Sequence, residues 1–369
     1  MDELELFKEE VDYAIRNGRL DLHLLTELLP LDSAGQLRER VRYLHDLLTD
    51  AFEEAFDLTM VDDDPAPEDG SEAAALQGAQ KLDETDRYEL GERLGRGGVG
   101  EVLLARDRRL DRTVAVKLML TEAQASPTAR SRFLYEGQVT ARLGHPGIIP
   151  VHDMGSTLDG RWFYAMRKAS GKTMAEVLKA DRDRGSPEPS QPLLRALIQV
   201  CLTMAYAHDH GVIHRDLKPS NILLGRYGEV YVADWGLAKR VADQVDTELV
   251  RPRLGDQTLP GTMLGTLQYI PPEQVRGDDV LTPAADVWGL GIILFEILTL
   301  QLPFAGRKGA ELMVRILSSV VPNPREATPE RNIDPMLAQV VLSATVQEAE
   351  QRTMTAREMA ERLTALLDR

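Results

Sequence analysis

The feature that most constrains this chain is the run at residues 214–221, which reads His-Arg-Asp-Leu-Lys-Pro-Ser-Asn. It places an acid, Asp216, two residues before a base, Lys218, and five residues before an amide, Asn221. Phosphoryl transfer to a hydroxyl uses these groups: the carboxylate accepts the hydroxyl proton, the ammonium neutralises the phosphate, and the amide oxygen holds a bridging Mg²⁺. The alternative, a polar surface loop without chemistry, requires seven positions to match by chance. The run therefore predicts a catalytic loop.

The composition is that of a globular protein, with 369 residues, 43% of them hydrophobic, which is enough for more than one domain. The single cysteine, Cys201, lies in an apolar helical pattern, so a disulfide framework is excluded and a reducing compartment fits. The longest apolar run, 287–300, is shorter than the ~20 residues of a membrane-spanning helix. The N-terminus is acidic, unlike a secretory signal. We therefore expect a cytoplasmic protein with no membrane span in this chain.

The net charge of −16 is concentrated at the N-terminus. Residues 1–86 contain 24 acidic and 7 basic side chains, whereas the rest of the chain is almost neutral. A nucleic-acid-binding protein would need a basic face, so no nucleic-acid partner is expected.

The acidic part divides in two. Residues 1–60 alternate acidic and apolar positions at helical spacing, which predicts a small amphipathic helical segment. Residues 61–86 have the composition of a flexible acidic linker. The helical segment is interpreted as a docking or self-association unit, an inhibitory arm or a solubilising extension, and these alternatives stay open.

From residue 88 onward the pattern changes to short strands and then to helices. The expected elements are strands at 88–94, 101–106, 113–118, 148–153 and 162–166, and a helix at 129–143. After a loop at 185–192 the chain reads as mostly helical through residue 367. A strand-rich lobe, 87–168, is therefore expected to precede a helix-rich lobe, 169–369.

A glycine-rich loop follows the first of these strands, at residues 95–100. Its G-x-G-x-x-G spacing is shared with dinucleotide-binding folds, but there it opens a helix, whereas here a strand-like segment follows. We therefore expect a hairpin that lies over phosphate groups. Its glycines, which allow the backbone N–H groups to approach phosphate oxygens, are Gly95, Gly97, Gly98 and Gly100.

Three further charged residues belong to the predicted chemistry. Lys117 ends the third strand, and Glu136 in the next helix is its candidate partner, the alternative being two solvated charges. Asp234 follows Asn221 after an apolar hairpin, and the two side chains offer the hard oxygen donors that Mg²⁺ requires.

These motifs, in this order, resemble the eukaryotic-like (Hanks-type) serine/threonine protein kinases of bacteria over about residues 88–368. Further matches are Gly265 with Thr266, the run Tyr-Ile-Pro-Pro-Glu at 269–273, the run at 286–291, and Arg352 as the partner of Glu273. The resemblance implies an α+β, two-lobed protein kinase fold. In that fold an N-lobe with an antiparallel sheet and one key helix precedes a helical C-lobe, and here the helical N-terminal segment comes before both.

The resemblance also implies the roles of residues. Asp216 is the catalytic base, Lys218 stabilises the phosphate and favours Ser/Thr acceptors, and Thr266 contacts both. ATP and Mg²⁺, with Mn²⁺ as an alternative, are the expected cofactors, and proteins are the expected substrates. The implied adenine site consists of Leu94, Val102 and Ala115 above the ring, Leu223 below it, Met166 as gatekeeper, and the backbone of Arg167 and Ala169.

The run of residues from 237 to 264 is the expected activation segment. Arg215 matches the arginine that pairs with a phosphate on this segment, and Lys239 or Arg240 could assist it. Autophosphorylation at Thr258 or Thr262 is therefore expected.

Three positions depart from the family pattern. Trp235 replaces the common Phe beside the metal-binding Asp, Pro271 replaces Ala, and Arg167 stands where Glu is common. None of the three changes removes a catalytic group.

Two alternatives to a protein kinase are weighed. A catalytically weak pseudokinase scaffold would lack a catalytic group, and none is missing. A small-molecule kinase shares the Asp-x-x-x-x-Asn spacing but gives no reason for Lys218 or for the segment 265–273.

Overall fold

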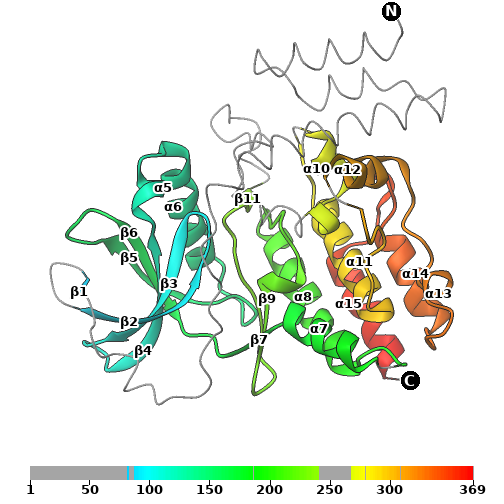
Figure 1. Ribbon diagram of the computed structural model, residues 1–369, viewed down its shortest axis with the longest axis horizontal. Coiled ribbons are helices and arrows are strands. Elements are labelled where there is room, and N and C mark those ends of the chain that lie inside the picture. The colour runs from blue at the N-terminus through cyan, green and yellow to red at the C-terminus, as the bar shows by residue number, and fades with distance from the viewer. Residues whose placement is uncertain are drawn as a thin grey trace, which may run out of the picture.

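The structure, a computed structural model, describes residues 81–82, 87–185, 187–240, 267–278, 280–307 and 309–368. The chain forms a lobe built on a sheet and a lobe built mainly of helices (Figure 1). The predicted helical segment 1–60, most of the predicted linker 61–86, and the residues Thr258, Thr262, Gly265 and Thr266 lie outside the described residues.

The first lobe contains one antiparallel sheet of six strands in the order β1-β2-β3-β4-β6-β5. The strands are β1 (Lys81–Leu82), β2 (Tyr88–Arg96), β3 (Gly100–Asp107), β4 (Arg112–Met119), β5 (Val151–Ser156) and β6 (Trp162–Arg167). The central strands β4 and β6 each have three consecutive buried residues, 114–116 and 163–165, so both faces of the sheet are covered there. The two-residue strand β1 falls within the stretch that was predicted to be a linker, and it pairs with β2.

The strand predicted at 148–153 begins three residues too early. Ile148 lies before β5 and forms an isolated parallel bridge with Val232, which belongs to the other lobe. Ile148 is 1% exposed because it packs into the core of the helical lobe. Its apolar character therefore reflects the junction between lobes rather than membership of the sheet.

One long helix packs against the sheet. Helix α6 (Pro127–Arg142) follows the short α5 (Thr121–Gln124) and contacts β5 and β6. It begins at an N-cap, Ser126, whose side chain accepts a hydrogen bond from the backbone of Ala129, with a proline at the first helical position. The predicted helix at 129–143 is therefore confirmed to within two residues at its start.

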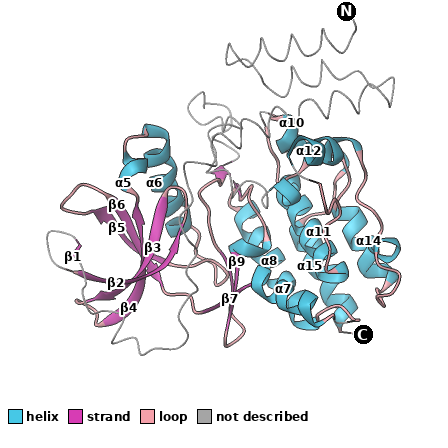
Figure 2. Ribbon diagram, in the orientation of Figure 1, coloured by secondary structure: helices cyan, strands magenta, loops and turns pink. Residues whose placement is uncertain are grey.

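The second lobe is mainly helical (Figure 2). Its helices are α7 (Met174–Arg184), α8 (Gln191–Asp209), α10 (Pro272–Arg276), α11 (Ala284–Thr299), α12 (Gly309–Ser318), α13 (Pro324–Ala327), α14 (Pro335–Ala344) and α15 (Ala356–Leu367). Its short strands are β7 (Gly171–Thr173), β8 (Val212–Ile213), β9 (Ile222–Gly225), β10 (Val230–Val232) and β11 (Lys239–Arg240). Among the described residues, no helix has both the length and the apolar character needed to cross a bilayer.

Helix α11 is the centre of this lobe. All but the first of its residues are buried, and it contacts α8, α14 and α15. Gly291 permits the close approach of α14, because a Cβ there would lie 2.9 Å from the Cβ of Ala344. A helix that is apolar on every side belongs inside a core, which is where the sequence predicted the run 287–300 to lie.

A partly buried polar cluster joins the start of β2 to β3 and β5. Arg87 donates two hydrogen bonds to Asp107, at 3.1 and 3.0 Å, and a third to Asp153 at 2.7 Å. The Tyr88 hydroxyl donates to the same Asp153 carboxylate at 3.1 Å. The hydrogen bonds from Arg87 hold the pKa of Asp107 below its ordinary value.

We predict that Asp107→Asn destabilises the protein by about 1 to 2 kcal/mol at neutral pH, since a charge-assisted pair is weakened while size is kept. Because the folded-state pKa of Asp107 is depressed, its stabilising contribution is present above the ordinary value of 3.8 and is lost as pH falls through the folded value. Urea unfolding at several pH values should therefore show a constant difference from wild type that shrinks only in acid.

The matched control is Asp111→Asn, which removes an equal charge from an exposed pair with Arg106. This control should leave unfolding unchanged at every pH. A difference between Asp107→Asn and wild type that grows in acid would contradict the assignment.

Candidate functional site

Hydrogen bonds attach the predicted catalytic loop to α11, the central helix of the helical lobe. The Asp286 carboxylate of α11 accepts hydrogen bonds from the backbone N–H groups of His214 at 2.9 Å and Arg215 at 2.8 Å, and lies 2.8 Å from His208 Nε2. Arg215 has φ +72°, a left-handed conformation that costs energy for a residue with a side chain. Although burial opposes ionisation, the hydrogen bond with His208 helps hold the pKa of Asp286 below its usual value. A buried, charged acceptor therefore fixes the strained backbone.

The three chemical groups of this loop form one hydrogen-bonded cluster. Lys218 Nζ lies 2.9 Å from Asp216 Oδ2, and Asn221 Nδ2 donates to the same oxygen at 3.1 Å. Asn221 Nδ2 also donates to the backbone carbonyl of Asp216 at 2.9 Å. Burial raises the pKa of Asp216, and the Lys218 charge opposes this shift. A carboxylate with a raised pKa is a better proton acceptor than an ordinary Asp.

The predicted pair of Lys117 and Glu136 is present. Lys117 Nζ lies 2.7 and 2.8 Å from the two carboxylate oxygens of Glu136. This ion pair links β4 to α6. Although burial disfavours the ammonium, the Glu136 charge raises the pKa of Lys117, so the lysine is cationic at neutral pH. The alternative of two solvated charges is wrong, because Glu136 is buried.

Asp234 lies beside this pair. A Cβ at Gly236 would be 3.3 Å from a Glu136 oxygen and 3.4 Å from an Asp234 oxygen, which places both carboxylates against the same glycine. Asp234 has φ +63° and an exposed side chain. Nearby cations, led by Lys117, outweigh the cost of partial desolvation and hold the pKa of Asp234 below its usual value. The carboxylate is therefore ionised and suited to bind a cation.

The glycine-rich loop is the hairpin between β2 and β3, as predicted. It is closed by a hydrogen bond from the Gly97 N–H to the Gly100 carbonyl at 2.8 Å. A Cβ at Gly100 would lie 3.0 Å from the Leu118 carbonyl and 3.3 Å from the Phe133 ring, so packing requires glycine there. A Cβ at Gly95 would meet nothing within 4 Å. The space beside Gly95 is therefore open, and packing within the chain does not require glycine there.

The predicted adenine-site residues lie on strands β2, β3, β4 and β6 of the sheet and on β9, except Ala169, which lies between β6 and β7. Val102 pairs in register with Lys117, and Ala115 pairs with Met166. Ala115 is buried, and Leu223 on β9 is half-buried. The other predicted positions are half-buried Val102, Met166 and Ala169 and exposed Leu94 and Arg167.

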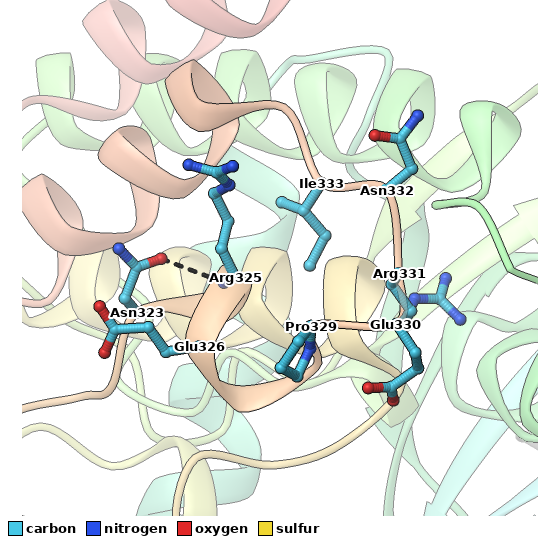
Figure 3. A pocket seen from close by; sticks show the side chains of 8 residues that line it. All are labelled: Asn323, Arg325, Glu326, Pro329, Glu330, Arg331, Asn332 and Ile333. Atoms are coloured by element: carbon cyan, nitrogen blue, oxygen red, sulfur yellow. Dashed lines mark hydrogen bonds between the residues drawn. The ribbon is translucent and has the colours of Figure 1, made fainter.

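A hollow of about 560 Å³ lies elsewhere, at α13 and the loop that follows it. Figure 3 shows that the polar ends of Arg331, Glu330 and Asn332 diverge from one another instead of converging on a common point. Arg331 is already bonded to the backbone carbonyls of Leu298 and Glu188. This hollow therefore lacks the converging polar groups of a catalytic site.

The predicted pairing of Arg352 with Glu273 is also present. Arg352 contacts Glu273 through two hydrogen bonds, at 2.8 and 3.2 Å, and both side chains are buried. This pair confirms the prediction for these two residues. Glu273 lies in α10, and Arg352 lies shortly before α15.

Comparison with known proteins agrees with this geometry. The sequence profile described as "Protein kinase domain" matches residues 88–365. The chain belongs to the protein kinase family. This confirms the predicted two-lobed α+β protein kinase fold. The family uses ATP and a divalent metal ion.

Several relatives carry the same description, serine/threonine-protein kinase PknD. The protein of Chlamydia felis is 34% identical over 289 residues, which is 74% of this chain and 30% of the relative. The protein of Chlamydia muridarum is 35% identical over 296 residues, 75% of this chain and 31% of the relative. The protein of Protochlamydia amoebophila is 34% identical over 269 residues, which is 69% of this chain and 27% of the relative. The kinase therefore spans about a third of the length of these relatives.

Sequence reasoning missed two residues of the site. Asp286 was noted only as part of an apolar helix motif, although it holds the catalytic loop. Tyr164 was not singled out, although its hydroxyl donates to Glu136 at 2.8 Å. A signal was available for Tyr164: it is two residues before Met166 in a strand, so the two side chains share one face of the sheet.

The departure at Trp235 is accommodated without loss of packing. The side chain is 1% exposed, and its indole N–H donates to the Val232 carbonyl at 3.1 Å. The ring lies edge-on to His214, with centroids 4.7 Å apart. A phenylalanine could make the ring contact but not the hydrogen bond.

We predict that Trp235→Phe destabilises the protein by about 1 to 3 kcal/mol, because volume is lost and a buried carbonyl loses its donor. Phosphoryl transfer should be retained, since no reacting group changes. Urea unfolding and an ATP assay measure the two effects.

Trp288→Phe is the matched control, because that indole is also fully buried but its N–H has no acceptor among the described residues. Trp288→Phe should lower the free energy of unfolding by less than Trp235→Phe does. An equal or greater cost for Trp288→Phe would mean that the Val232 hydrogen bond contributes nothing.

Proposed function

We propose that this kinase transfers the γ-phosphoryl group of ATP to Ser and Thr hydroxyls of protein substrates, with Asp216 as the base. The observation that carries the proposal is the convergence of Asp216, Lys218 and Asn221 in one hydrogen-bonded cluster. The paired Lys117 and Glu136 supply the second group of charges.

In this mechanism the acceptor oxygen attacks the γ-phosphorus as its proton passes to Asp216, and the bond from phosphorus to the ADP oxygen breaks. Lys218 neutralises charge on the transferring group, and Lys117 binds the remaining phosphates. Thr266, which lies outside the described residues, is proposed to contact Asp216 and Lys218. The protein contributes mainly position and electrostatics, because the phosphoryl transition state needs little covalent help.

Asn221 and Asp234 are the residues that would hold the divalent ion, which we propose to be Mg²⁺, with Mn²⁺ as the alternative. Asn221 uses its amide N–H groups on Asp216, which leaves its oxygen for a cation. Asp234 is kept ionised by its surroundings. Hard oxygen donors of this kind suit Mg²⁺, which when bound neutralises phosphate charge.

The nucleotide base is proposed to lie between the two lobes. Leu94, Val102 and Ala115 would cover one face of adenine and Leu223 the other, beside Met166. The backbone groups of Arg167 and Ala169 would bind its edge. The exposed side chain of Arg167 supports this, because a main-chain contact does not depend on the residue type.

A pseudokinase scaffold is the second candidate. It is disfavoured because the five charged or amide groups required for transfer are present and paired or clustered. Docking or self-association through residues 1–60, and a cytoplasmic location, stay predictions.

We further propose that phosphorylation of Thr258 or Thr262 activates the enzyme. Arg215 Nε and two guanidinium nitrogens of Arg132, on α6, are buried without an acceptor among the described residues. Burial, followed by the nearby charge of Arg132, lowers the pKa of Arg215. A phosphate between the two arginines would supply the missing acceptors and relieve their repulsion.

We predict that Asp216→Asn lowers kcat by about 10² to 10⁴-fold, the usual contribution of a general base. Transfer of radiolabelled phosphate from ATP measures this, and binding of a fluorescent ATP analogue controls for loss of the fold. Equal incorporation by wild type and Asp216→Asn would contradict the catalytic role.

We predict that mass spectrometry of active enzyme finds phosphate on Thr258 or Thr262, and that replacing both by Ala lowers activity by about tenfold, the scale of ordinary coupling energies. Arg132→Met should abolish the gain that phosphorylation brings. The exposed neighbour Arg130 on the same helix provides the control Arg130→Met, which should retain the gain. Full activity of the double Ala variant would contradict the switch.

A further inference from the structure

Tyr164 has a buried hydroxyl beside Lys117 and Glu136, and the mechanism proposed above assigns it no role. It lies on β6, and its side chain is 3% exposed. The hydroxyl donates a hydrogen bond to Glu136 Oε1 at 2.8 Å. Its ring also contacts Phe133 on α6, with centroids 5.3 Å apart. The side chain therefore joins the sheet to the helix that carries Glu136.

The acceptor of this bond is the atom that also meets Lys117. Glu136 Oε1 lies 2.7 Å from Lys117 Nζ and 2.8 Å from the Tyr164 hydroxyl, while Oε2 is left to Lys117 at 2.8 Å. The Lys117 ammonium is 5.9 Å from the centre of the Tyr164 ring. Burial, reinforced by Glu136, raises the pKa of Tyr164 well above its usual value, so the hydroxyl keeps its proton and remains a donor.

The helix can approach this ring because of one glycine. A Cβ at Gly137 would overlap Met154 Cε and lie 3.2 Å from Tyr164 Cδ1. Gly137 follows Glu136 directly, so α6 meets the sheet at the turn that carries the carboxylate. Moving α6 outward would separate Glu136 from Lys117 and leave the buried Tyr164 hydroxyl without its acceptor.

We propose that Tyr164 is a positioning residue for phosphoryl transfer, which holds the Glu136 carboxylate against Lys117 from the sheet side. The proposal rests on the proposed role of Lys117 as a ligand of the ATP phosphates. It adds a restraint on α6 that is independent of the segment 241–266, since β6 and α6 are both described elements of the same lobe. A residue of the sheet therefore helps to fix the position of the Glu136 carboxylate.

Tyr164→Phe tests this by removing only the hydroxyl. We expect kcat/KM for ATP to fall about fivefold, the scale of one ordinary hydrogen bond, mainly through a higher KM for ATP. The affinity for a fluorescent ATP analogue should fall by a similar factor.

Tyr88→Phe is the matched control. Tyr88 is also a fully buried tyrosine of this sheet, and its hydroxyl also donates to a carboxylate, Asp153, at 3.1 Å. Both variants should lose stability in urea, but Tyr88→Phe should leave ATP kinetics and affinity unchanged. If the two variants alter ATP kinetics equally, or if Tyr164→Phe matches wild type, the positioning role is overturned.

A double-mutant cycle separates action through Glu136 from simple packing. A Glu136→Ala variant lacks the carboxylate that accepts the Tyr164 hydrogen bond. Adding Tyr164→Phe to this variant should therefore cause no further loss of kcat/KM or of nucleotide affinity. The same fivefold loss in that background would overturn the proposal. Wild-type enzyme that transfers no phosphate would instead refute the proposed function, and the affinity measurements would still decide the role of Tyr164.

Discussion

The buried carboxylate of Asp286 is the contact on which the rest of the site depends. It accepts the backbone N–H groups of His214 and Arg215, and the left-handed conformation of Arg215 persists because those two bonds hold it. Asp286 in turn belongs to α11, which is buried along almost its whole length. The position of Asp216, one residue beyond the strained one, is therefore inherited from the packing of the whole helical lobe.

The other half of the site is held quite differently. Glu136 lies on a single helix that rests on a sheet, and its position depends on a few polar contacts, with Lys117 and Tyr164, and on the missing side chain of Gly137. Arg132, one turn before Glu136, has buried guanidinium nitrogens with no acceptor among the residues that the structure describes, and so has Arg215 on the catalytic loop. A phosphate bound by both arginines, as proposed for the activation segment, would link the two halves of the site.

The sequence predicted the reacting groups well because their spacing is local: Asp216, Lys218 and Asn221 lie within six residues. Non-local contacts were harder. The start of β5 was misplaced because Ile148 is buried by the other lobe, and β1 was missed because two residues form a strand only when β2 pairs with them. Asp286 is 72 residues from His214, and no local pattern encodes such a bond. Arg352 and Glu273 are 79 residues apart, and only family resemblance predicted their pairing.

Asp216 and Asp234 illustrate what the fold adds to a motif. In the sequence they are two equivalent carboxylates, yet the fold shifts their pKa values in opposite directions. Burial raises that of Asp216, whereas Lys117 and other cations hold that of Asp234 below its ordinary value. A carboxylate with a raised pKa accepts a proton more readily, and one with a lowered pKa keeps its charge for a cation. The fold therefore distinguishes two carboxylates that the sequence presents as the same kind of side chain.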